Sequence, residues 1–145
     1  MTLLLAQSYD VPAAEKTAQE QYLDIYLAYD HEYLFEQKDD QRQIYLHYSK
    51  ILRRLISLRN TYPNFEPDML NRRIKDSDTK LQELKTQIVQ HPRPSPETLG
   101  PFIDNMNTDL ENWKELQGKL SEWKSKLIAN RISDDKSILA YLKQP

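Results

Sequence analysis

The sequence predicts an all-α protein, a single domain built as an antiparallel bundle of four long helices plus a short C-terminal helix. Only two glycines occur in 145 residues, whereas Glu, Gln, Lys, Leu and Arg dominate the composition. Apolar residues recur at alternating steps of four and three, which is the period of an α-helix packed on one side. Prolines divide the chain at a few places. A chain of this length needs only one core.

The first predicted helix covers residues 12 to about 38, after an N-terminal arm at residues 1–11. Pro12 suits the first turn of a helix, because its missing N–H is not needed there. The helix carries two apolar stripes on nearly opposite sides, one of Ala18, Tyr22, Ile25, Tyr26, Tyr29 and Tyr33, the other of Leu23, Leu27 and Leu34. We therefore expect contacts from two directions, and self-association if the leucine stripe stays uncovered.

The second predicted helix begins after Asp39 and Asp40, which offer an N-terminal cap, and ends near Tyr62. Its seam is the most regular in the chain and contains Ile44, Tyr48, Ile51, Leu55, Leu58 and Tyr62. No acidic residue occurs between Gln41 and Phe65. A basic helix beside the acidic first helix, joined by a short connection, indicates an antiparallel hairpin.

The third predicted helix begins near Pro67 and ends by His91, with Ser77 as the one polar residue in its seam. Residues 91–101 are rich in proline and are predicted to form an extended linker. A long fourth helix is then expected from Pro101 to about Arg131. Ser133 is expected to cap a short last helix that ends at Leu142.

Part of the chain resembles a known family. Phe35, Tyr48 and the turn from Tyr62 to Pro67 are similar to tetratricopeptide-repeat hairpins of bacterial envelope proteins, in which a long second helix ends in tyrosine-proline, an aromatic residue and another proline. The resemblance covers about residues 20–80. It implies a helical hairpin that binds other proteins and is not an enzyme. No second copy follows at a fixed period, so a solenoid is not expected.

The sequence gives little sign of catalytic or metal chemistry. There is no cysteine, no Glu-x-x-His pair of the kind that holds two irons in helical bundles, and no glycine-rich phosphate loop. No serine or threonine has the setting of a nucleophile. We therefore expect a non-enzyme without metal or cofactor.

Two alternative functions stay open at this point. His47 followed by Lys50 is similar to the motif of histidine phosphotransfer domains, although Ile51 stands where that family has glycine. A helical nucleic-acid-binding module is the other alternative, using a basic corner at the end of the second helix and the start of the third, formed by Arg53, Arg54, Arg59, Arg72, Arg73 and Lys75. The net charge of −2 argues against nucleic acid as the main partner.

The favoured interpretation is a soluble, non-catalytic protein-protein interaction or scaffold module. Tyrosine and tryptophan serve half-buried cores and protein interfaces equally well. The expected contact residues are Tyr22, Tyr26, Tyr29, Tyr33, Arg53, Arg54, Arg59, Arg72, Arg73, Trp113 and Trp123. The partner is expected to be another protein or helical segment, with a homo-oligomer as an option. No membrane span is expected, and the compartment is left undetermined.

Overall fold

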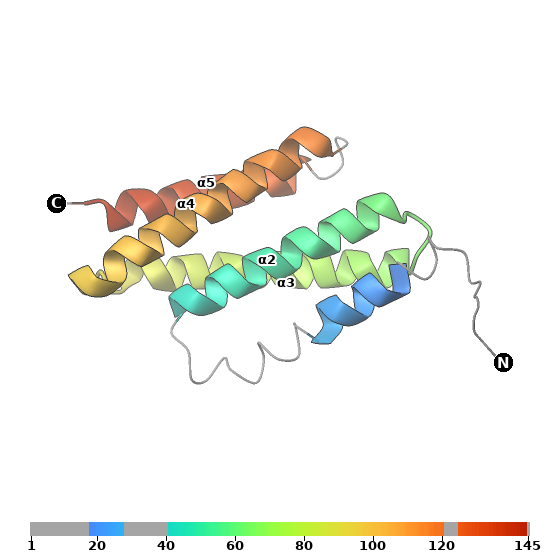
Figure 1. Cartoon of the computed structure of the whole chain (residues 1–145), viewed down its shortest axis with the longest axis horizontal. Helices are drawn as coiled ribbons and strands as arrows, with labels where there is room; N and C mark the ends of the chain where they lie inside the picture. Colours follow the sequence, from blue (N-terminus) through green and yellow to red (C-terminus); the bar gives the residue numbers. More distant parts are fainter. Residues whose placement is uncertain (1–17, 28–40, 121–124, 145) are drawn as a thin grey trace.

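All regular structure in residues 18–27, 41–120 and 125–144, which the computed structural model describes, is α-helical. The helices are residues 18–27, α2 (Gln41–Thr61), α3 (Pro67–Gln90), α4 (Pro96–Lys119) and α5 (Ser125–Leu142) (Figure 1). The prediction of an all-α fold is confirmed over these ranges, and the packing is consistent with a bundle. The N-terminal arm and the predicted contact residues Tyr29, Tyr33 and Trp123 lie outside the described ranges.

The helices pair as two hairpins. α2 packs mainly on α3, and α4 packs mainly on α5. The hairpins then meet through α2 against α4 and α3 against α5 (Figure 1). The helical residues 18–27 lie beside the α2–α3 hairpin, where the Tyr22 ring packs at a tilt against the Phe65 ring, with centroids 6.0 Å apart. None of the helices within the described ranges combines the length and the apolar character needed to cross a bilayer.

The seams of α2 and α3 follow the predicted period. In α2 the buried apolar residues include Ile44, Tyr48, Ile51, Leu55 and Leu58, and in α3 they are Leu70, Ile74, Leu81, Leu84 and Ile88. The limits of both helices agree with the predicted ones within about one residue. Apolar burial at a helical period was therefore a sufficient signal for this hairpin.

The turn between α2 and α3 is tight. The amide of Phe65 donates to the carbonyl of Tyr62 over 3.0 Å, and Glu66 then adopts a left-handed conformation with φ of 42°. Pro67 follows as the first helical residue, where no N–H is required. The turn reverses the chain direction and aligns the two seams.

The start of α4 differs from the prediction. The linker is shorter than residues 91–101, because the helix begins at Pro96 and contains Pro101. A proline normally pushes the residue before it out of the helical region, through a clash with that residue's Cβ. The preceding residue here is Gly100, which has no Cβ, and a Cβ built there meets nothing else within 4 Å. The helix therefore passes through Pro101.

The predicted single helix from Pro101 to Arg131 is wrong, and so is the start of the last helix at Ser133. α4 ends at Lys119, Leu120 is extended with ψ of 156°, and α5 begins at Ser125. A continuous rod would place Ile128 about 22 Å along the axis from Trp113. Folding back instead lets the apolar face of α5 join the core, and Gly118 lowers the helix propensity near the break.

Candidate functional site

A buried polar cluster joins α2 to α4. The Ser49 hydroxyl donates to Oδ2 of Asp109 over 2.8 Å and accepts from the Trp113 indole N–H over 2.7 Å. One guanidinium nitrogen of Arg53 lies 2.5 Å from Oδ1 of Asp109 and 3.1 Å from the Ser49 oxygen. Ser49, Asp109 and Trp113 are buried. The hydroxyl of Ser49 thus has all of its hydrogen-bonding capacity used.

The cluster continues from α2 to α5 through a second buried carboxyl. The Tyr45 hydroxyl donates to Oδ1 of Asp135 over 2.6 Å, and both residues are fully buried. Burial raises the pKa of Asp135 to about 9, and the neighbouring Asp109 carboxylate adds to the rise. Burial likewise raises the pKa of Tyr45 well above its ordinary value. At neutral pH, Asp135 therefore carries a proton and Tyr45 keeps its own.

A third group of charges joins α5 to α3. Arg131 is buried, with its Nε 2.8 Å from Oδ1 of Asp78 and a terminal nitrogen 2.5 Å from Oδ2 of Asp134. Lys85 on α3 lies 3.9 Å from Asp134. Burial raises the pKa of Asp78, and Arg131 opposes that rise. We call these three groups together the polar layer: Tyr45, Ser49, Arg53, Asp78, Lys85, Asp109, Trp113, Arg131, Asp134 and Asp135.

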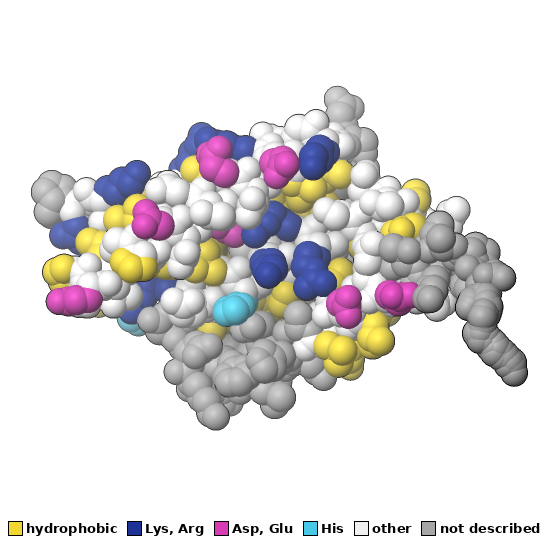
Figure 2. Space-filling model, viewed as in Figure 1, with side chains coloured by type: hydrophobic (Ala, Val, Ile, Leu, Met, Phe, Trp, Pro, Cys, Tyr) yellow, Lys and Arg dark blue, Asp and Glu magenta, His cyan; other side chains and the backbone are white. Residues whose placement is uncertain are grey.

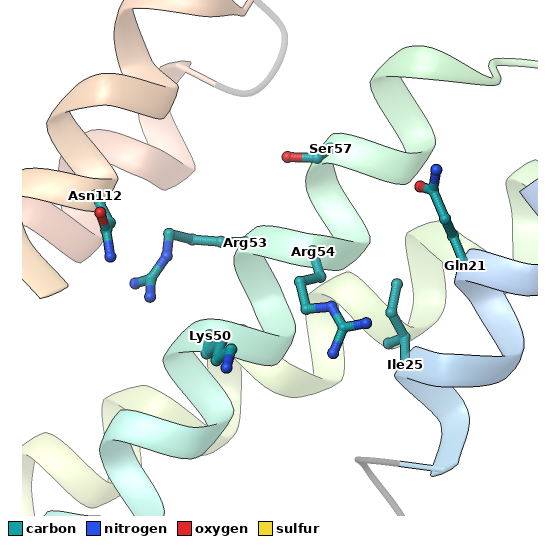
Figure 3. Close-up of a pocket in the computed structure, with 7 residues that line it drawn as sticks. All are labelled: Gln21, Ile25, Lys50, Arg53, Arg54, Ser57 and Asn112. Carbon is teal, nitrogen blue, oxygen red and sulfur yellow. The ribbon is translucent and has the colours of Figure 1, made fainter. Parts of the chain in front are cut away.

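An open groove of about 600 Å³ lies over α2, bounded by residues 18–27 on one side and α4 on the other (Figure 3). Three of its lining residues are cationic and come from α2, and the others are polar or apolar. They are Lys50, Arg53, Arg54 and Ser57 on α2, Gln21 and Ile25 on the first helical segment, and Asn112 on α4. Figure 2 shows positive side chains gathered over the middle of this face. We call this feature the basic groove.

Arg53 belongs to both the polar layer and the basic groove. Its guanidinium carbon lies 5.3 Å from the centroid of the Trp113 ring, a cation–π arrangement, while Asp109 and Ser49 hold one terminal nitrogen. Fully buried Trp113 thus supports an arginine at the wall of the groove and has no exposed surface of its own. A role for Trp113 as a surface contact does not fit this placement.

The described members of the predicted tyrosine stripe, Tyr22 and Tyr26, are only partly accessible. Tyr22 is half-buried and accepts a hydrogen bond from Nε of Arg73 over 3.1 Å. The Arg73 guanidinium carbon also lies 5.3 Å from the centroid of the Tyr26 ring. Tyr26 is 40% exposed, beside Leu23 at 55% and Leu27 at 56%. Among the described residues of the two stripes, Leu23 and Leu27 are therefore more exposed than Tyr22 and Tyr26.

The members of the predicted basic corner make different contacts. Arg53 and Arg54 line the groove in the middle of α2, whereas Arg59 bonds the side chain of Asn71 and the carbonyl of Pro63 at the turn. Arg73 ties α3 to residues 18–27, as described above. Arg72 and Lys75 are exposed on α3, and His47 is exposed on α2 one turn before Lys50. The residues that the structure does bring together are Lys50, Arg53 and Arg54.

Sequence reasoning missed Asp109, Asp135 and Arg131 as parts of a site, and it considered Lys50 only beside His47 in the phosphotransfer alternative. For the groove a signal existed, since Lys50, Arg53, Arg54 and Ser57 have the spacing i, i+3, i+4, i+7 of one helical stripe. For the buried acids no local signal exists, because Asp109 and Asp135 stand among many surface carboxylates in the sequence. Within the described ranges, no group of three or more His, Asp or Glu side chains is placed to hold a metal ion.

Comparison with protein-family models, with curated proteins and with solved structures finds no match to this chain. The resemblance of residues 20–80 to a tetratricopeptide-repeat hairpin stays a prediction.

Proposed function

We propose that this protein is a non-catalytic protein-interaction module, an antiparallel helical bundle that presents an apolar helix face to a partner. The observation that carries the proposal is the exposed face formed by Leu23, Tyr26 and Leu27, which we call the leucine face. These three side chains are the exposed large hydrophobic residues of the described ranges, and they lie together on one ten-residue helical segment.

The segment is fixed to the bundle by its opposite face. Ala18 and Ile25 are buried, and Tyr22 packs on Phe65 and bonds Arg73. Single exposed leucines are ordinary on protein surfaces, but a cluster on one face of a helix whose other face is packed on the bundle is typical of a binding surface. The matching occupant is the apolar face of a helix from another protein, because helix faces bury one another by interdigitating side chains at this spacing.

The test is site-specific photo-crosslinking in the native source of the protein. The full chain carries a benzophenone amino acid in place of Leu23, or in place of exposed Thr79 on α3 as the matched control. We expect a discrete crosslinked protein from position 23 that is absent from position 79. The product should be lost when Leu27→Gln is added, since Leu27 lies one turn further on the same face.

Equal products from both positions, or products that persist with Leu27→Gln, would count against the leucine face as the binding surface. Analytical sedimentation of the purified chain separates the two kinds of partner. A mass that rises with concentration, and that Leu27→Gln returns to the monomer value, identifies the occupant as a second copy of the chain.

A further inference from the structure

The basic groove has an unbalanced charge. Its lining contains three cations and no acid. Arg53 is largely neutralised by Asp109, whereas Lys50 and Arg54 form no ion pair with any described residue. Glu20 and Asp24, the carboxylates of the neighbouring segment, are not among the residues that line it. Positive side chains held close together without counter-charges raise the local concentration of anions.

One of the three cations is held in place before any ligand arrives. Arg53 is 15% exposed, pinned by Asp109 and Ser49 and packed over the Trp113 ring. Only one of its terminal nitrogens is used by these contacts, so the remaining N–H groups can donate to an oxyanion in the groove. An arginine whose rotamer is already fixed loses little side-chain entropy on binding.

The arrangement of the cations decides between kinds of anion. In Figure 3 the Arg53 guanidinium extends toward Asn112 on α4, the Arg54 guanidinium extends toward Ile25, and the Lys50 ammonium lies between them. The three groups are spread across the groove and do not converge on one point. A compact anion such as phosphate is bound best by converging donors. Spread cations fit a ligand that carries several separate negative groups.

The spacing along α2 fits carboxylates on a peptide. Lys50 and Arg54 are four residues apart, which is a rise of about 6 Å on a helix. Side chains at i and i+2 of an extended peptide are about 6.6 Å apart, and side chains at i and i+4 of a helix are about 6 Å apart. A nucleic-acid backbone gains its affinity from many phosphate contacts, and the groove offers only three cations.

We propose that the basic groove binds an acidic segment of a partner protein, whose successive Asp or Glu carboxylates pair with Lys50 and Arg54 and with the free N–H groups of Arg53. Gln21, Ser57 and Asn112 supply further polar contacts along the walls. The groove is a separate surface from the leucine face. The inference therefore shares the protein-binding class of the proposed function but does not depend on the leucine face.

The test is fluorescence anisotropy of the full chain with a fluorescein-labelled hexaglutamate peptide at low salt. We expect saturable binding that weakens as salt is added. The double variant Lys50→Gln/Arg54→Gln should weaken binding by about tenfold or more, because it removes both unpaired cations. The matched control is Arg72→Gln/Lys75→Gln, which removes the same charge from exposed positions on α3 and should change the affinity by less than about twofold.

A charge reversal sharpens the test. Lys50→Glu/Arg54→Glu should lose hexaglutamate and gain binding to labelled hexalysine, and the circular dichroism spectrum should stay that of the parent. No binding of hexaglutamate, or equal losses in the groove and control variants, would overturn the proposal. Stronger binding of a single-stranded oligonucleotide through the same two residues, or competition by pyrophosphate as effective as that by the peptide, would also overturn it.

These experiments test the proposals for the basic groove and for the leucine face independently. Leu23→Gln/Leu27→Gln should leave hexaglutamate binding unchanged, since neither leucine lines the groove. A chain that gives no crosslink specific to position 23 but binds hexaglutamate would refute the proposed function alone. The opposite result would refute the basic groove alone.

Discussion

The interface inside the α2–α3 hairpin differs from the interface between the two hairpins. The seams that close α2 on α3 are apolar except for Ser77. The buried or half-buried side-chain bonds between the hairpins are instead those of the polar layer, from α2 to α4 and α5 and from α3 to α5. The α2–α3 interface is held mainly by apolar burial, with the polar contacts of Arg59 to Asn71 and of Lys80 to the Tyr48 ring beside it, whereas the interface between the hairpins combines burial with buried paired charges.

The two interfaces contribute to the stability of the fold in different ways. Apolar burial is non-directional, so the α2–α3 interface supplies stability that hardly depends on pH. Buried ion pairs add little net stability, because desolvation offsets most of their attraction, but they impose a strong penalty on arrangements that leave a charge unpaired. We infer that the polar layer fixes how the hairpins sit on each other. It also holds Arg53 at the basic groove.

Of the substitutions that distinguish the two interfaces, Asp109→Ala should lower the free energy of unfolding the most. It leaves Arg53 without its carboxylate and the Ser49 hydroxyl without its acceptor, so we expect the free energy of unfolding to fall by about 3–5 kcal/mol. The measurement is urea unfolding followed by circular dichroism and by tryptophan fluorescence. The matched control is Asp104→Ala, an exposed acid on the same helix, which should cost less than about 0.5 kcal/mol. Similar small losses for both variants would mean that the layer is not coupled to folding.

The pH dependence of stability should separate the two interfaces. The folded-state pKa of Asp135 is about 9, far above the ordinary value of 3.8. The folded state therefore holds a proton that the unfolded state has released, and this stabilisation is present in acid and is lost as the pH rises toward 9. Asp135→Asn keeps an acceptor for the Tyr45 hydroxyl and cannot ionise. We expect it to flatten the profile and to stabilise the protein relative to the parent by about 1.4 kcal/mol for each pH unit between the two pKa values.

Leu55→Ala is the control for that experiment, because Leu55 is fully buried in the α2 seam. It should cost about 2–5 kcal/mol by the same amount in mild acid and in mild base. A parallel pH profile for Asp135→Asn and the parent chain would contradict the assignment of the titration to Asp135.

The sequence was sufficient for the α2–α3 interface and insufficient for the α4–α5 hairpin, and the reason is physical. The α2 seam is a local pattern, so the burial of Ile51 and Leu55 can be predicted from their spacing alone, without knowledge of any other helix. The limits of α4 depend on nonlocal facts. Gly100 removes the Cβ clash that Pro101 would otherwise cause near the start of α4. At the other end, the break after Lys119 lets Ile128 on α5 pack in the core.

The same distinction applies to the candidate site. The stripe of Lys50, Arg53 and Arg54 was readable as helical spacing. The bonds of Arg59 to the turn and of Arg73 to Tyr22 were not, because they depend on how the turn and residues 18–27 fold. Asp109 and Asp135 become buried and hydrogen-bonded only when α4 and α5 pack against α2. A chain with many acids gives no local sign of which ones will be buried.

Two buried serines provide the smallest and most direct comparison. Ser49 lies in the polar layer and bonds Asp109, Trp113 and Arg53, whereas the equally buried Ser77 hydroxyl has no partner among the described residues. Ser49→Ala should destabilise by about 1–3 kcal/mol, because it leaves the Trp113 N–H unpaired. Ser77→Ala removes an unsatisfied hydroxyl from an apolar seam and should stabilise by about 1 kcal/mol. Chemical denaturation of the two variants at one pH measures both, and shifts of the same sign would show that the two interfaces do not differ in the way described.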